Sequence, residues 1–268
     1  MRIGVGTRRH SDLARNLLLD KVNALILAGA PAGVEMSPDD GNMSRAMLPI
    51  GGKTMIQWVV DALRGSPSVG RITAVGHVQA DGLDQVVEPC DTLVANIRRG
   101  LDAIGPCDAV LIVSADVPML TSEAVEDFIA RAQRVGADMA YPIIAKADCQ
   151  ARHPELRRTY LKTGDGVFTG GNIMLVRPDF IQRNWQAIEN AYAARKHILQ
   201  LARMIGVGTL LRVVVGQVFP AVLTISGLEK AASRMLGGKV AAVISAYPEI
   251  GEDVDKPSDL SAVRGILE

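Results

Sequence analysis

The sequence predicts an α/β fold in which helices cover both faces of a mainly parallel sheet, making three layers. Short apolar runs alternate with segments of helical periodicity along the first half of the chain. The lengths of those segments suit right-handed strand–helix–strand units. The chain has 268 residues, of which 48% are hydrophobic, and it contains no low-complexity run. These observations indicate an ordered core of ordinary size.

Apolar runs that end at a glycine or an acid predict the strands, and a 3.6-residue period predicts the helices between them. The expected strands are 22–30, 71–76, 108–116 and 137–144. The expected helices are 54–65, 91–105 and 121–136. Each helix has residues at its ends that favour starting or stopping there. The starting residues are Asp91 or Thr92 and the pair Thr121/Ser122, and the stopping residues are Gly65, Gly105 and Gly136.

The pattern changes after Tyr141. Residues 158–176 predict two strands around the turn Gly164-Asp165-Gly166, and a largely helical block follows at about 180–238. A strand at 239–247 and a helix at 256–267, with Pro257 in its first turn, complete the pattern. We therefore expect an N-terminal extension, 1–20, and one α/β domain, 21–268, that carries a helical insertion.

Composition and charge exclude several classes of protein. The chain has 29 basic and 29 acidic residues, so it lacks the basic excess typical of nucleic-acid-binding proteins. Its three cysteines are far apart and form no CxxC pair, which indicates reduced thiols rather than a disulfide framework. Residues 1–20 are Arg-rich and lack the apolar core of a secretory signal. We expect a cytoplasmic protein with no nucleic-acid partner.

One stretch is long and apolar enough to raise the question of a membrane span. Between Met204 and Leu228 the one charged residue is Arg212. Glycines and Pro220 interrupt the stretch, and an arginine near the middle costs about 2.5–3.5 kcal/mol on insertion scales. We expect two short helices packed in the protein and no transmembrane span. Contact of 204–228 with a membrane interface is an alternative, and a homodimer interface is another use of the insertion.

Familiar nucleotide and catalytic motifs are absent. The loop at Gly29–Gly33 lacks the third glycine of a dinucleotide fingerprint, and Met47 stands where the first glycine of a P-loop ending in Gly51–Thr54 would have to be. The sequence contains no GxSxG elbow, and its four histidines show no zinc-ligand spacing. These absences exclude the common NAD, P-loop and serine-hydrolase sites.

Two residues lie at strand ends where α/β sheets bind ligands. Gly29 lies at the end of the first predicted strand, and Asp116 ends the strand 108–116. Ligands in such sheets bind beyond the carboxyl ends of the strands. Asp116 is either a helix cap before Pro118 or a metal ligand, and the residues around it do not decide between the two.

Four segments in order resemble the nucleotidyltransferase superfamily. They are "LILAGA" at 25–30, "SRAMLPIGGKTMIQWVVDAL" at 44–63, "VLIVSADVPMLT" at 110–121 and "DVDKPSDL" at 253–260. The resemblance is to the molybdenum-cofactor guanylyltransferases, the sugar-1-phosphate nucleotidylyltransferases and the cytidylyltransferases for sugar alcohols. Its order and spacing cover about 22–265. It implies a GT-A-like fold and Mg²⁺-dependent transfer of a nucleoside monophosphate from an NTP to a phosphorylated small molecule, with release of pyrophosphate.

The resemblance also implies roles for individual residues. Asp116 and Asp255 match the metal ligands, with Asp253 as an alternative to Asp255. Arg45 stands where the family has a catalytic lysine, and Lys53 is a second catalytic candidate. The remaining candidates bind the two substrates. On the nucleotide side they are Leu27, Ala28, Gly29, Ala30 and Thr92, and on the acceptor side Gly171, Asn172 and Arg158.

The chain departs from the family pattern in the loop after the first strand. "PAGVEMSPDDGN", 31–42, is longer and acidic, and it lacks the arginine that the family carries there. This departure leaves a nucleotide-binding protein without catalysis as one alternative. A GT-A glycosyltransferase that uses a sugar nucleotide is the other, because Asp253–Asp255 has the Asp-x-Asp pattern of a metal site.

Overall fold

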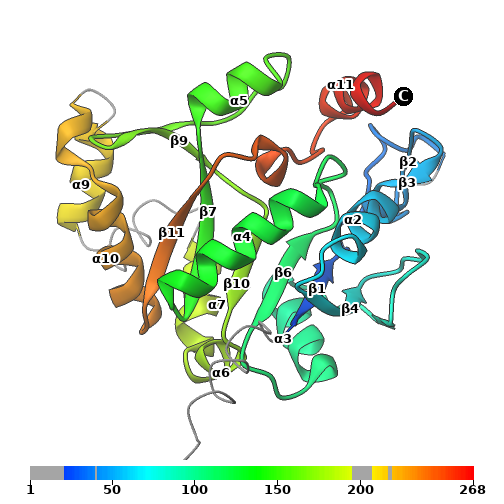
Figure 1. Cartoon of the computed structure of the whole chain (residues 1–268), viewed down its shortest axis with the longest axis horizontal. Coiled ribbons are helices and arrows are strands. Elements are labelled where there is room, and N and C mark those ends of the chain that lie inside the picture. Colours follow the sequence, from blue (N-terminus) through cyan, green and yellow to red (C-terminus); the bar gives the residue numbers. More distant parts are fainter. Residues whose placement is uncertain (1–20, 40, 195–206, 217–218) are drawn as a thin grey trace, which may run out of the picture.

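Figure 1 shows a computed structural model that describes residues 21–39, 41–194, 207–216 and 219–268. The predicted N-terminal extension, 1–20, lies outside the described residues. Within them, one nine-stranded sheet has the order β5-β4-β1-β6-β10-β7-β9-β8, and β11 pairs with β7. The predicted α/β class with a mainly parallel sheet is confirmed. Six strands run in one direction, namely β1 (Val22–Leu27), β4 (Val69–Val75), β5 (Gln85–Val87), β6 (Val110–Ser114), β7 (Met139–Ala145) and β11 (Val240–Ser245).

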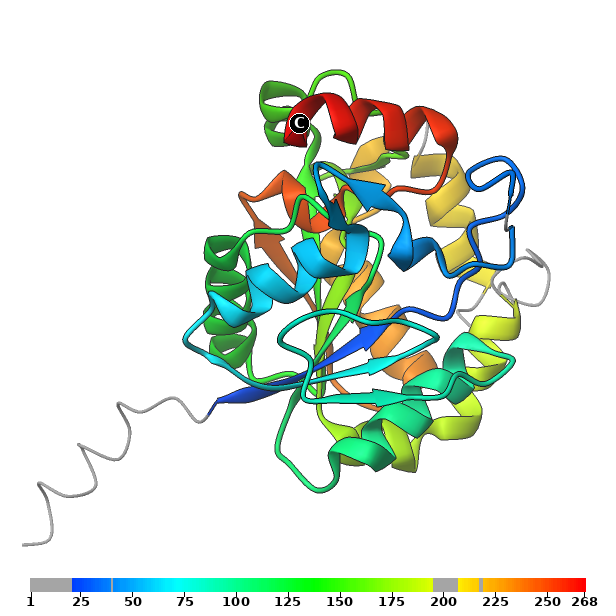
Figure 2. The same ribbon diagram turned by 90° about the vertical axis from the view of Figure 1, so that its right-hand side faces the viewer.

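Two apolar clusters place helices on both faces of this sheet. Along β1, Ala24 and Ile26 join one cluster, whereas Leu25 joins the other, as the two-residue period of a strand requires. Figure 2 shows α2 on one side of the sheet and α3 on the other. The first face is covered by α2 (Met55–Arg64) and α4 (Ser122–Val135), and the second by α3 (Leu93–Ile104), α6 (Pro178–Arg183) and α7 (Trp185–Ala194).

The predicted helix ends are confirmed by their hydrogen bonds. Thr92 Oγ1 accepts from the backbone N–H of Ala95 at 3.1 Å, and Thr121 Oγ1 accepts from that of Ala124 at 3.2 Å. Gly136 ends α4 in the left-handed conformation, with φ of 56°. Polar side chains that favour helix starts were therefore a reliable guide to the local structure.

The segment 158–176 forms three strands, not the two that the sequence predicted. The strands β8 (Leu161–Thr163) and β9 (Gly166–Gly170) form the expected hairpin, and β10 (Ile173–Val176) is an additional strand between β6 and β7. β7 pairs with β10 over its first residues and with β9 over its last residues. The chain therefore crosses from β9 to β10 through Gly171 and Asn172, at the level of the carboxyl end of β6.

Several short elements had no clear periodicity in the sequence. They are the hairpin β2 (Pro49–Ile50) and β3 (Lys53–Thr54), η1 (Arg45–Met47), α5 (Lys146–Arg152) and η3 (Pro248–Gly251). The helical block between β10 and β11 was predicted, and besides α6 and α7 it contains α9 (Val207–Gly216), η2 (Pro220–Val222) and α10 (Ile225–Leu236). Within the described residues, no helix is both long and apolar enough to cross a bilayer. The interfacial contact of 204–228 stays a prediction.

A third apolar cluster attaches the last helix to the carboxyl edge of the sheet. α11 (Pro257–Leu267) contributes Leu260 and Val263, which pack with Leu48, Ile50 and Met119 from chain segments near the strand ends. Figure 2 shows α11 lying across this edge. The cluster includes buried Val254, so it also fixes the two aspartates that flank this residue.

The turn after β4 offers a test of the packing beneath the strand-end loops. Gly76 has φ of 152°, and a Cβ atom there would lie 2.5 Å from the carbonyl oxygen of Ala28. We expect Gly76→Ala to lower the free energy of unfolding by about 2 kcal/mol, because backbone atoms must move apart. Gly265→Ala is the control, since apart from its chain neighbours and the backbone of its own helix no atom lies within 4 Å of its Cβ position. Urea unfolding measures both variants; equal stability of Gly76→Ala and the unmodified protein would contradict the packing.

Candidate active site

A cavity of about 450 Å³ opens at the carboxyl ends of β1 and β6. The backbone of Leu27–Ala30 forms one wall and the start of α3, at Thr92, forms another. A Cβ atom on Gly29 would lie 2.9 Å from Asn96 Nδ2, so glycine lets α3 approach the loop closely. We call this the first cavity. Its remaining lining includes Arg45, Ser114, Asp116, Tyr141, Gly171 and Asn172.

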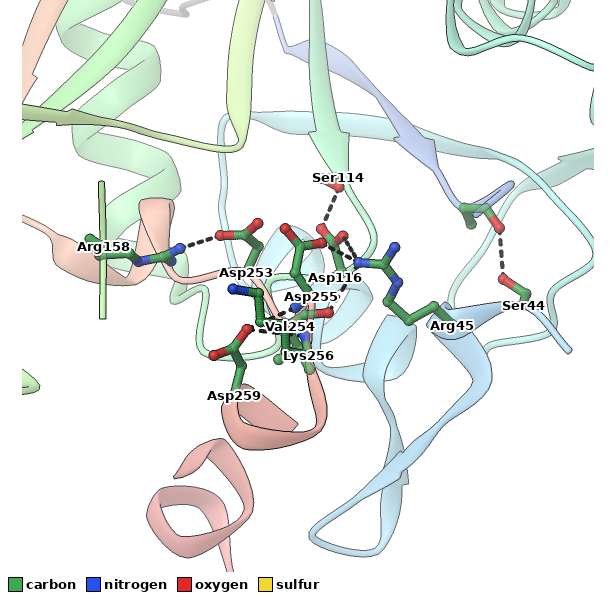
Figure 3. A network of polar contacts seen from close by, with 11 residues as sticks. Ser44, Arg45, Ser114, Asp116, Arg158, Asp253, Val254, Asp255, Lys256 and Asp259 are labelled. Atoms are coloured by element: carbon green, nitrogen blue, oxygen red, sulfur yellow. Dashed lines mark hydrogen bonds and ion pairs between the residues drawn. The ribbon is translucent and has the colours of Figure 1, made fainter. Parts of the chain in front are cut away.

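The loop after β1 returns to its own starting point and brings Arg45 to the first cavity. Ser44 Oγ donates to the carbonyl of Ala28 at 2.7 Å, and the backbone N–H of Arg45 donates to the carbonyl of Ala30 at 2.9 Å. Figure 3 shows the Arg45 side chain pointing from η1 toward the aspartates. The long acidic loop therefore keeps a cation beside the strand end, although it lacks the arginine that the resemblance implied.

Arg45 contacts both predicted metal ligands with the same nitrogen. Its Nη1 lies 3.3 Å from Asp116 Oδ2, forms an ion pair with Asp255 Oδ1, and donates to the carbonyl of Val254 at 3.2 Å. Asp116 and Asp255 come from distant parts of the sequence, yet their carboxylates converge on one cationic group. The structure thus brings together three of the residues that the sequence singled out.

Backbone and side-chain hydrogen bonds hold the two aspartates in place. The N–H of Val254 donates to the carbonyl of Asp116 at 2.9 Å, and Ser114 Oγ donates to Asp116 Oδ1 at 2.5 Å. Asp259 Oδ2 accepts from the N–H groups of Asp255 and Lys256 at 3.2 and 3.1 Å. Neither Asp116 nor Asp255 caps a helix, because Thr121 caps α4 and the carboxylate of Asp259 caps α11.

The surroundings make both of these carboxylates difficult to ionise. Burial raises the pKa of Asp116, and the charges of Asp253 and Asp255 raise it further, more than Ser114 and Arg45 lower it. Burial and the neighbouring Asp253 also raise the pKa of Asp255, despite its contact with Arg45. Burial is the largest cause of both shifts, and the remaining part comes from neighbouring carboxylates, whose repulsion a bound cation would offset. The aspartates are therefore suited to hold a cation.

Asp253 behaves differently from its neighbour two residues away. Burial raises its pKa, but the hydrogen bond and charge of Arg158 outweigh burial and lower the pKa below its ordinary value. Asp253 pairs with Arg158 Nη1, whereas Asp255 pairs with Arg45 (Figure 3). The two acids of the Asp-x-Asp sequence therefore face different partners and do not act as an equivalent pair.

A second cavity, of about 740 Å³, lies on the far side of this group. It shares Tyr141, Gly171 and Asn172 with the first cavity, so the two are neighbours. Asp116 lines the first cavity and Asp255 lines the second. Three cationic residues also line the second cavity, namely Arg157, Arg158 and Lys256. The carboxylate pair therefore stands at the boundary between two adjoining spaces.

The donor set suits a hard divalent cation. Among the described residues, no group of three or more His, Cys, Asp or Glu side chains is placed to hold a metal ion. Mg²⁺ commonly uses only one or two protein carboxylates and completes its shell with water and substrate phosphates. The two carboxylates that converge on Arg45 fit that requirement better than they fit zinc, which takes three or four protein ligands.

The structure does not bring Lys53 to this site. Its Nζ pairs with Asp61 Oδ2 at 2.6 Å and lies 4.6 Å from the centre of the Trp58 ring, and Lys53 lines neither cavity. Gly170 and Gly171 do line the second cavity, but they make room for protein atoms. A Cβ atom on Gly170 would lie 2.5 Å from Tyr141 Oη, and one on Gly171 would lie 2.6 Å from Ile250 Cγ2.

Sequence reasoning missed four residues that shape the site, namely Ser44, Asn96, Ser114 and Tyr141. Ser44 directly precedes Arg45, and Ser114 lies two residues before Asp116. Their closeness in sequence to predicted site residues could have marked both serines as part of the site. Asn96 accepts from the N–H of Cys90 at 2.5 Å, and it lies inside a helix with no distinctive spacing. Tyr141 lies in an apolar strand and was indistinguishable in sequence from a core aromatic.

Comparisons with known proteins agree with this geometry. A solved structure described as a hypothetical transferase from Thermus thermophilus is 31% identical, has a TM-score of 0.79, and is matched over 90% of this chain and 99% of its own. The 2-C-methyl-D-erythritol 4-phosphate cytidylyltransferase of Thermus thermophilus is 19% identical, with a TM-score of 0.55 over 92% of this chain and 98% of its own.

A third structure is CMP:2-keto-3-deoxy-manno-octonic acid synthetase in complex with CTP, which is 15% identical, with a TM-score of 0.53 over 92% of this chain and 98% of its own. At 19% and 15% identity, the cytidylyltransferase and the synthetase show that this chain has the same fold as they do. A search of curated proteins found no match. The profile of the MobA-like NTP transferase domain matches residues 24–222, which is most of the sequence. The chain therefore belongs to the family of MobA-like NTP transferase domains and is a nucleotidyltransferase.

Proposed function

We propose that the protein transfers a nucleoside monophosphate from an NTP to a phosphorylated small-molecule acceptor in a Mg²⁺-dependent reaction that releases pyrophosphate. One observation carries the proposal. Two cavities adjoin at Tyr141, Gly171 and Asn172, and a pair of carboxylates suited to a cation stands at their boundary. A reaction that joins two anionic substrates needs two adjoining spaces and a positive charge between them.

The first cavity suits the NTP and the second suits the acceptor. Leu27–Ala30 and the beginning of α3 line the first cavity, and the N-terminal end of a helix favours phosphate groups. Arg157 and Lys256 line the second cavity, and cationic side chains bind phosphate groups. Asp116 and Asp255 would hold Mg²⁺, which when bound neutralises charge on the phosphates.

The residues of the chain would position the substrates rather than exchange protons with them. An oxygen of the acceptor phosphate forms a bond to the α-phosphorus of the NTP, while the bond from that phosphorus to the pyrophosphate oxygen breaks. The attacking oxygen is already anionic, so no general base is required. Arg45 lies beside the carboxylates and would add positive charge near the phosphates.

Pyrophosphate release with each of the four NTPs, over a panel of phosphorylated acceptors, tests the proposal. We expect Mg²⁺-dependent release for at least one combination of NTP and acceptor. Tight NTP binding without release for any acceptor would instead support a protein that binds nucleotides without catalysis. In a parallel assay with sugar nucleotides as donors, sugar transfer with release of a nucleoside diphosphate would support a glycosyltransferase.

Replacing either predicted metal ligand should reduce turnover without unfolding the protein. We expect Asp116→Asn and Asp255→Asn each to lower turnover about 100-fold or more, because a metal ion supplies several kcal/mol of charge stabilisation. Asp102→Asn is a matched control, since Asp102 is exposed and lines neither cavity. Pyrophosphate release and circular dichroism measure activity and folding. Unchanged turnover in Asp116→Asn would rule out its role.

The raised pKa of Asp116 predicts how metal-free stability depends on pH. For a group with a raised folded pKa, stabilisation is fully present below the unfolded pKa of about 3.9 and is lost as pH rises through the folded pKa. Asn imitates the protonated form, so metal-free Asp116→Asn should melt above the unmodified protein at pH 7. This advantage should shrink toward pH 4.

Added Mg²⁺ provides the second half of the same experiment. Ligands that bind only the folded state raise its Tm, so MgCl₂ should raise the Tm of the unmodified protein and leave that of Asp116→Asn nearly unchanged. Differential scanning calorimetry measures both effects. Equal Mg²⁺ stabilisation of the two proteins would show that Asp116 is not a ligand.

A further inference from the structure

A third cavity, of about 280 Å³, lies between the sheet and α10 and is lined mostly by carbon atoms. Strand pairing places its residues on one face: Ile143 is opposite Gly170, and Leu161 is opposite Phe168. We call it the apolar cavity. Its other lining residues come chiefly from the first turns of α10 and from β11, among them Ile225, Leu228, Glu229, Ala232, Val240 and Ala242.

Two polar side chains in the lining, Glu229 and Thr163, form hydrogen bonds within the protein. Glu229 Oε1 accepts from the N–H of Ala242 at 2.8 Å. Thr163 Oγ1 donates to the carbonyl of Gly166 at 2.9 Å and accepts from the N–H of Asp165 at 3.2 Å. The cavity therefore offers a ligand apolar contact rather than hydrogen bonds, which is the chemistry that receives hydrocarbon.

The apolar cavity adjoins the space where the acceptor would bind. Tyr141, Thr169 and Gly170 line both the apolar cavity and the second cavity. Tyr141 also lines the first cavity, so its ring stands where all three spaces meet. The absence of a side chain at Gly170 leaves room for this ring, because a Cβ atom there would lie 2.5 Å from Tyr141 Oη.

From this juxtaposition we infer that the acceptor is an amphiphile: its phosphate binds beside Arg157 and Lys256 in the second cavity, and an apolar chain extends past Tyr141 into the apolar cavity. The inference rests on the proposed function, because it names the class of acceptor for the same site. A phosphate beside Asp255 and Lys256 and a chain beside Phe168 and Leu228 would satisfy both ends of such a molecule. A fully polar acceptor would leave the apolar cavity unused.

Binding of n-alkyl phosphates tests the inference without requiring turnover. Methyl, butyl and hexyl phosphate, each used as a monomer in Mg²⁺ buffer, are titrated into the full chain by calorimetry. We expect affinity to rise about threefold to fourfold for each methylene that enters the cavity. Affinity that does not change with chain length, or no binding of any alkyl phosphate, overturns the inference.

Two variants and one control locate the surface that binds the alkyl chain. Ala232→Phe fills the apolar cavity and Phe168→Ser makes it polar, so both should flatten the dependence on chain length while methyl phosphate binds as before. Phe219→Ser is the matched control, because Phe219 is 64% exposed and is not among the residues that line the cavity. It should keep the full dependence. A dependence that survives both cavity variants places the alkyl chain elsewhere and overturns the inference.

The pyrophosphate assay separates failure of the inference from failure of the proposed function. Suppose that small polar phosphates give pyrophosphate release, while the affinity for alkyl phosphates does not depend on chain length. This result would contradict the amphiphilic acceptor and still support the proposed function. The opposite result is binding that depends on chain length and is abolished by the cavity variants, with no pyrophosphate release for any NTP. It would support the apolar site and contradict the proposed reaction.

Discussion

The site depends on one backbone hydrogen bond, from the N–H of Val254 to the carbonyl of Asp116. It ties the segment before α11 to the end of β6 and so places Asp255 beside Asp116. Burying Val254 under α11 protects this bond from water, and Arg45 joins the two carboxylates from a third segment. Apolar packing beneath α11 thereby determines which charges meet at the boundary of the two cavities.

The positions of the two cavities follow from how β7 is shared. One stretch of β7 pairs with β10 and the next with β9, so Gly171 and Asn172 must cross between them. Their backbone groups bond to Pro142, Ile250 and Ser114, which fastens the crossing to the sheet. The two cavities are consequently adjacent, and the crossing residues Gly171 and Asn172 line both of them.

Sequence could predict what is local and could not predict what depends on pairing. The caps at Thr92 and Thr121 were readable because each acts within a few residues of itself. β10 escaped notice because Gly170–Asn172 resembles the edge of one strand rather than a crossing. Lys53 and Arg45 were both plausible phosphate ligands by spacing, and only the hairpin β2–β3 shows that Lys53 faces Asp61.

The cap of α11 has a consequence for ligand binding. The carboxylate of Asp259 fixes the N–H groups of Asp255 and Lys256, so this turn holds its shape through protein contacts alone. Because the turn is already ordered, it loses its conformational entropy when the protein folds and not when a ligand binds. A ligand that binds these carboxylates therefore binds a preorganised turn. Its interaction energy contributes to affinity, because none of it is needed to order the chain.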